Sequence, residues 1–63
     1  MERLKSFRKS LGLKSKDMAI RIGVSPSYYY KVEEDIQTPS FTFLVKLKRK
    51  FPNINIDEMF FEK

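Results

Sequence analysis

The most distinctive polar side chains lie between positions 25 and 32, where serines, tyrosines and a lysine stand close together. In a helix, where each residue turns by about 100°, Tyr29 and Val32 share one side, and Ser27 and Lys31 lie on the opposite side. Ser27 and Lys31 are four residues apart, so they can reach one target together. Lysine can donate to O6 or N7 of guanine, and a serine hydroxyl can donate or accept. This spacing suits the recognition of DNA base edges.

The three consecutive tyrosines have different expected roles. Tyr30 lies on the same outer side as Lys31, and Tyr28 lies on the flank between the two sides. Their hydroxyls can bond phosphates, and their rings can touch a thymine methyl group. Tyr29 faces inward, and its phenol needs a partner because an unpaired buried hydroxyl costs roughly 1–3 kcal/mol.

The residue types that most enzymes need are missing. The chain has no histidine and no cysteine, which excludes disulfides, the usual zinc sites and the common nucleophile–base pairs. It also has no glycine-rich phosphate loop. We therefore predict no catalytic activity, no metal site, no cofactor and no small-molecule substrate.

Length and charge point to a small protein with an anionic partner. The 63 residues are enough for a single domain, 1–63, with a modest core. Thirteen Lys and Arg residues against eight Asp and Glu residues give a net charge of +5, which attracts anions. No apolar run resembles a signal peptide or approaches the length of a membrane span. We expect a cytoplasmic, nucleoid-associated protein with no membrane partner.

Apolar residues recur at helical spacing in five segments, so the expected fold is all-α. The expected helices span about 2–11, 15–22, 26–34, 41–51 and 56–61. Turn signals separate them: glycines at 12 and 23, N-caps at Ser15, Ser25 and Ser40, and a capping box that starts at Asn55. The residues expected to face the core are Leu4, Phe7, Leu11, Met18, Ala19, Ile22, Tyr29, Val32, Leu44, Leu47, Phe51, Ile56, Met59 and Phe60.

The second and third segments have the features of a helix-turn-helix. They meet through Gly23-Val24-Ser25, a three-residue turn with glycine at the sharp corner. Ala19 is small enough for the two helices to cross closely, and Val24 can fill the angle between them. Proline at position 26 suits the first position of the third helix, where its missing N–H costs nothing.

The joint spacing of these residues resembles the lambda-repressor-like, Cro-like (XRE-type) DNA-binding domains. The resemblance covers roughly residues 3–60. It is carried by Gly12-Leu13, Met18-Ala19, Ile22-Gly23-Val24-Ser25, Val32-Glu33, Pro39-Ser40 and the stretch from Phe51 to Phe60. It implies a compact five-helix bundle in which the third helix, about 26–34, lies in the major groove of DNA.

The resemblance also implies roles for individual residues. Base contacts would come from Ser27, Tyr28 and Lys31, and the partner would be a palindromic operator in double-stranded DNA bound by a homodimer. The starts of the second and fourth helices would face phosphates. The expected backbone contacts are Lys14, Ser15, Lys16, Ser25, Tyr30, Thr38 and Ser40. The implied function is that of a transcriptional regulator, similar to phage or mobile-element repressors.

Several positions depart from the family pattern. Ser15 stands where the family often has a glutamine that reaches a phosphate, and Tyr29 replaces an aliphatic residue. Asp35 stands at a frequent glycine position, and it ends the run Glu33-Glu34-Asp35. Those carboxylates would repel phosphate if they lay close to it.

A second function stays open on the same scaffold: a protein-interaction module, such as an antitoxin-like or anti-repressor partner. Its surface would use the acidic loop together with Ile20, Met59 and Phe61, which could equally form a dimer contact. The basic residues of the fourth helix, Lys46, Lys48, Arg49 and Lys50, are expected to form a solvated face away from DNA.

Overall fold

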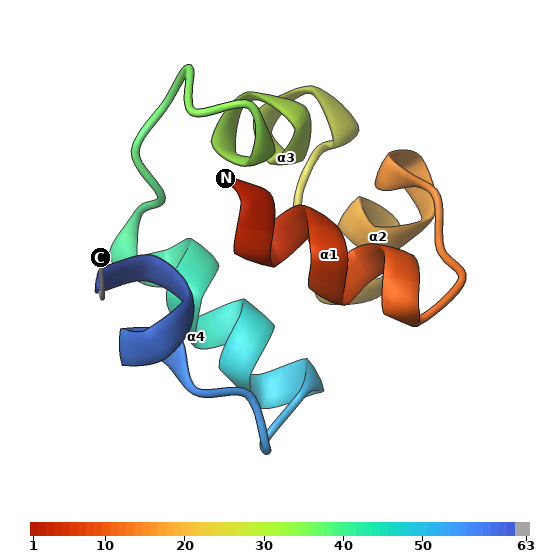
Figure 1. Ribbon diagram of the computed structural model, residues 1–63. Helices are drawn as coiled ribbons and strands as arrows, with labels where there is room; N and C mark the ends of the chain where they lie inside the picture. Colours follow the sequence, from red (N-terminus) through yellow and green to blue (C-terminus); the bar gives the residue numbers. More distant parts are fainter. Residues whose placement is uncertain (62–63) are drawn as a thin grey trace.

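The computed structural model describes residues 1–61, and within that range it has five helices and no strand. The helices are α1 (Glu2–Ser10), α2 (Ser15–Ile22), α3 (Pro26–Glu33), α4 (Phe41–Lys50) and η1 (Asp57–Phe61), as shown in Figure 1. The predicted all-α fold and its five helical segments are confirmed. The described chain measures 26 × 24 × 20 Å.

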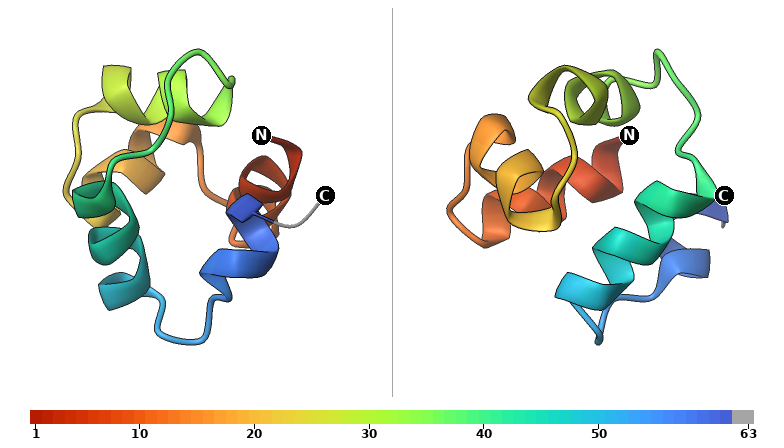
Figure 2. Two further views of the ribbon diagram at one scale, coloured as in Figure 1. Left: turned by 90° about the vertical axis from the view of Figure 1, so that its left-hand side faces the viewer. Right: turned by 180° about the vertical axis from the view of Figure 1, so that it is seen from behind.

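The helices place α3 at one end of the molecule. Figures 1 and 2 show the turn between α4 and η1 at the opposite end. The helices α1 and α2 lie between these two ends, and both pack against α3. This arrangement leaves one side of α3 open to solvent.

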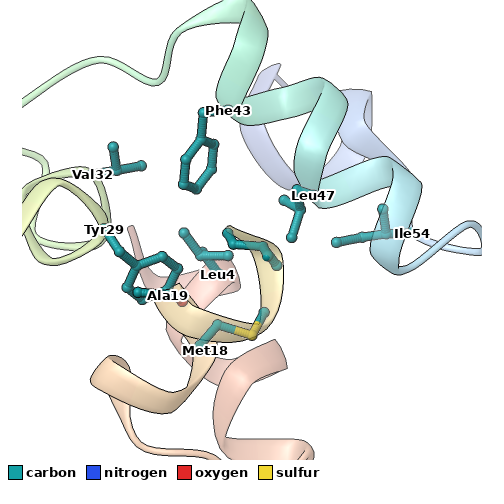
Figure 3. Close-up of a cluster of buried hydrophobic side chains, with 9 residues drawn as sticks. Leu4, Met18, Ala19, Tyr29, Val32, Phe43, Leu47 and Ile54 are labelled. Atoms are coloured by element: carbon teal, nitrogen blue, oxygen red, sulfur yellow. The ribbon is translucent and has the colours of Figure 1, made fainter. Parts of the chain in front are cut away.

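The core is formed by side chains that converge from α1, α2, α3, α4 and the turn before η1 (Figure 3). Its buried members are Leu4, Met18, Ala19, Ile22, Tyr29, Val32, Phe43, Leu47 and Ile54. Because the core contains Tyr29 and Val32, it holds the inner side of α3 firmly in place.

Most of the predicted helix boundaries are confirmed. The Ser40 hydroxyl accepts from the Phe43 N–H (3.1 Å), and the Asn55 side chain accepts from the Glu58 N–H (3.0 Å). Gly23 follows α2 with φ +85°, in the left-handed region that glycine tolerates best. The predicted start signals at Ser40 and Asn55 and the predicted stop signal at Gly23 therefore act at these positions.

Several details of the elements differ from the expectations. The helix α1 ends at Ser10, and Leu11, the residue after its last turn, is 41% exposed instead of facing the core. Phe43 takes a central core place that the sequence did not predict. The last helix, η1, is a π-helix, with Met59 and Phe60 half-buried against the core.

Candidate nucleic-acid interface

The start of α3 is capped as the sequence predicts. The Ser25 hydroxyl accepts a hydrogen bond from the Tyr28 N–H (3.1 Å), and Pro26 occupies the first helical position. Since the Ser25 hydroxyl oxygen accepts in the cap, its proton is still free to reach a neighbouring anion. The cap fixes where α3 begins and therefore which side chains turn outward.

The two sides of α3 differ sharply in exposure. Tyr29 and Val32 are fully buried, whereas Ser27, Tyr30 and Lys31 are exposed. The outer side therefore presents hydroxyls and an ammonium group, the donor and acceptor types that can reach base edges and phosphates. On the inner side, the buried Tyr29 and Val32 side chains fix the orientation of α3 relative to the core.

A buried polar network locks the end of α3 to α1. Arg8 holds the Glu33 carboxylate with two hydrogen bonds, Nε to Oε2 (2.9 Å) and Nη2 to Oε1 (3.0 Å). The Tyr29 hydroxyl donates to the same Oε2 (2.7 Å). This is the partner that the inward-facing phenol requires. Burial and the Glu33 carboxylate together raise the pKa of Tyr29 well above its usual range, so the phenol stays a donor.

The network keeps Glu33 charged. Burial alone would raise the pKa of Glu33, but hydrogen bonds from Arg8 and Tyr29 outweigh burial and lower it. In turn, the hydrogen bond to Glu33 raises the pKa of Arg8. Glu33 is only 3% exposed, so its charge is neutralised inside the domain and does not face an anionic partner.

The other two carboxylates of the acidic run also have cationic partners. Glu34 pairs with Lys5 (3.0 Å), and Asp35 pairs with the Met1 ammonium group (2.7 Å). Asp35 adopts φ +61°, the left-handed conformation that a glycine would take most easily. Both carboxylates are thus partly neutralised, which reduces the repulsion expected from the sequence.

The start of α2 differs from the prediction. Ser15 is the first helical residue and not the N-cap; Lys14 takes the cap position with an extended backbone and no side-chain cap. The cause lies in the preceding loop, because Arg8 Nη1 donates to the Leu13 carbonyl (2.8 Å) and fixes the chain just before Lys14. The first N–H groups of α2 are therefore not satisfied by a side chain, and Lys14 and Lys16 beside them are exposed.

The start of α4 is joined to α3. The Tyr28 hydroxyl accepts from the Ser40 N–H (2.9 Å), and its ring packs edge-on against Phe43 (centroids 5.8 Å apart). Tyr28 is half-buried, so it lies at the junction of the two helices and not on the outermost side of α3. Thr38 and Ser40 are exposed beside this helix start.

Sequence reasoning anticipated the need for a Tyr29 partner but did not find the whole network. The i, i+4 spacing of Tyr29 and Glu33 was the signal available for that bond. The role of Arg8 had no local signal, since Arg8 and Glu33 are 25 positions apart in the chain. Only the packing of α1 against α3 brings them together.

The predicted partner-surface residues lie on two helices and differ in exposure. Ile20 on α2 is 63% exposed, and Phe61 on η1 is 64% exposed, whereas Met59 is half-buried against the core.

Across residues 1–61, no cluster of acidic side chains could hold a metal ion. None of the helices in that range has the length and apolar character needed to cross a membrane.

Comparison with known proteins identifies this arrangement. A family model described as Helix-turn-helix matches residues 4–59, which includes all of α2, α3 and α4. No curated protein and no solved structure matches the chain significantly.

Proposed function

The chain belongs to the XRE/lambda-repressor-like family of helix-turn-helix DNA-binding domains, and we propose that it regulates transcription by binding one specific sequence of double-stranded DNA. The observation that carries this proposal is the two-sided character of α3. Its inner side is buried with Tyr29 and Val32, and its outer side exposes Ser27 and Lys31. A firmly anchored helix with an open polar side is what major-groove reading requires.

Base recognition is assigned to Ser27 and Lys31, with Tyr28 at the edge of the contact. Each well-placed contact to a base would discriminate by roughly 1–3 kcal/mol. Because the Tyr28 oxygen already accepts from the Ser40 N–H, its remaining role is to donate its own proton to a phosphate or base edge.

Phosphate contacts are assigned to two helix starts. At α2, the uncapped N–H groups, the Ser15 hydroxyl and the ammonium groups of Lys14 and Lys16 can bind one stretch of backbone. At α4, Thr38 and the Ser40 region lie beside another positive helix end. The hydroxyls of Ser25 and Tyr30 complete the predicted set.

Titration of short duplexes at two salt concentrations tests the proposal. If Lys14, Lys16 and Lys31 each release counterions from the duplex, they alone predict a slope of log K against log salt near −2.7, about −0.9 for each lysine. Lys14→Ala should reduce that slope by about one contact for every sequence. Absence of duplex binding even at low salt would overturn the proposal.

A specific observation also supports protein interaction as the second candidate. Ile20 and Phe61 are largely exposed apolar side chains, and such residues often mark a partner or dimer contact. We propose that, when the chain binds DNA, a contact through these residues joins two copies of the chain on a palindromic operator, as in a phage-type repressor of the bacterial nucleoid. In the alternative, the chain has an antitoxin-like or anti-repressor role. Another protein would then contact these residues, and the chain would bind duplexes weakly.

A further inference from the structure

Two hollows lie beside α4, and one of them reaches the turn between α2 and α3. One, of about 290 Å³, is lined largely by apolar side chains that include Phe7, Leu11 and Phe51. The other, of about 300 Å³, is lined by Lys46, Arg49, Lys50 and the end of α2. Lys50 lines both hollows, and we call the two together the α4-end surface. Figures 1 and 2 show the end of α4 and α3 toward opposite ends of the molecule.

The apolar part of this surface is ordered and accessible. The Phe7 and Phe51 rings pack edge-on with centroids 5.2 Å apart, which fixes the floor of the hollow. Leu11 stands at its rim, 41% exposed, in the position that the sequence pattern assigned to the core. An exposed leucine beside a fixed aromatic floor can bury a further apolar side chain.

Within residues 1–61, two cations of the basic part are left to meet an anion. The Lys46 ammonium donates to the Gly23 carbonyl (2.9 Å), and the Lys48 ammonium donates to the Ile54 carbonyl (2.6 Å). These bonds tie two of the four cations of α4 to backbone oxygens, and leave Arg49 and Lys50 exposed. Within the described part of the chain, the lining of both hollows contains no carboxylate. The surface therefore favours an anionic partner.

We propose that the α4-end surface binds an acidic peptide segment of a partner protein. A large apolar side chain of that segment enters the hollow beside Leu11 and Phe51, and neighbouring carboxylates meet Arg49 and Lys50. A DNA backbone fits less well, because its phosphates would satisfy the cations but leave the apolar hollow uncovered. The apolar hollow is lined by the turn after α4, toward the opposite end of the molecule from α3, so the peptide can bind there while a duplex occupies the outer side of α3.

Selection of short random peptides on the full chain tests the proposal. The enriched peptides should carry carboxylates close to a Phe, Trp or Leu residue. For an enriched peptide measured by fluorescence anisotropy, the Arg49→Gln/Lys50→Gln variant should weaken binding by roughly tenfold or more, and Leu11→Ser by roughly threefold or more. Lys31→Ala is the matched control on α3 and should leave peptide binding unchanged.

Amide signals of the labelled chain locate the bound peptide and separate the possible results. Shifts at Leu11 and Lys50 that persist when a duplex is added would support the proposal. Enriched peptides without acidic residues, or shifts confined to α3, would overturn it. A duplex that shifts Leu11 and Lys50 as strongly as the peptide does would also overturn it, because the surface would then be a second DNA contact. These results do not depend on whether α3 reads bases.

Discussion

At the scale of single residues, the side chains that face away from DNA matter as much as those proposed to touch it. The Glu33 carboxylate accepts from Arg8 on α1 and from Tyr29 on its own helix. Such a charge-assisted network fixes the rotation of α3, and with it the direction of Lys31. The sequence could predict that Tyr29 needs a partner, but not that Arg8 completes the set, because that contact depends on tertiary packing.

Replacing Tyr29 with phenylalanine should destabilise the fold. The variant keeps the ring in the core but removes a hydrogen bond to a charged acceptor, so we expect a loss of roughly 1.5–3 kcal/mol in the free energy of unfolding. Urea unfolding followed by circular dichroism measures this loss. Tyr30→Phe is the matched control, since Tyr30 is 54% exposed. An equal loss in the two variants would refute the role of the Tyr29 hydroxyl.

The same network predicts loss of stability in acid. The pKa of Glu33 in the folded state lies below its ordinary value of 4.5, so the unfolded state takes up the proton more readily. The stabilisation is therefore complete above pH 4.5 and declines as the pH falls through the folded-state pKa. Unfolding measured by urea between neutral and acidic pH should show this decline.

A triple variant isolates the contribution of the network to the pH dependence. Arg8→Met/Tyr29→Phe/Glu33→Leu removes the ion pair together with the phenol, so no charge is left buried without a partner. Its stability should fall less steeply in acid than that of the natural chain. If the two chains lose stability in parallel, other carboxylates are responsible for the acid sensitivity.

At the scale of the elements, local signals in the sequence explain most of the helix starts and stops. The Ser25, Ser40 and Asn55 caps form as predicted, since each depends only on residues a few positions away. Ser15 does not act as a cap, because a bond from Arg8 to Leu13 sets the chain path before α2. The exposure of Leu11 likewise depends on the tertiary contacts at the end of α1.

The helix-turn-helix corner should be sensitive to the backbone conformation of Gly23. Its φ is +85°, and a Cβ added there meets nothing within 4 Å, so Gly23→Ala adds conformational strain without a clash. We expect a loss of roughly 1–2 kcal/mol in the free energy of unfolding, measured by thermal or urea unfolding. Ser27→Ala, on an ordinary helical residue, is the control and should change stability little. A neutral Gly23→Ala variant would contradict the strain argument.

At the scale of the whole molecule, the sequence was sufficient to predict the all-α fold and the burial pattern of α3, because helical periodicity reports directly on which side faces the core. It cannot specify the operator or the partner copy, since both depend on contacts between molecules. The α4-end surface could not be predicted from the sequence either, because residues from α1, α2 and α4 form it only in the folded chain.

The proposed homodimer should form on DNA. Analytical ultracentrifugation with a palindromic duplex chosen by selection should show two copies of the chain on each duplex. Phe61 is exposed on η1, so Phe61→Ser should weaken the binding of the second copy while leaving the fold intact. A single copy on a palindromic duplex would contradict the dimer, and an unaltered second step in Phe61→Ser would exclude Phe61 from its contact.

The most direct test of the central claim, that the outer side of α3 reads DNA bases, is selection of bound duplexes from a random library. The selection is run in parallel with the natural chain, Ser27→Ala, Lys31→Ala and Lys14→Ala. We predict that Ser27→Ala and Lys31→Ala each lose the preference at particular base positions. Lys14→Ala should weaken binding to all sequences alike, because Lys14 is proposed to contact only the backbone. Unchanged base preferences in both α3 variants would contradict the claim.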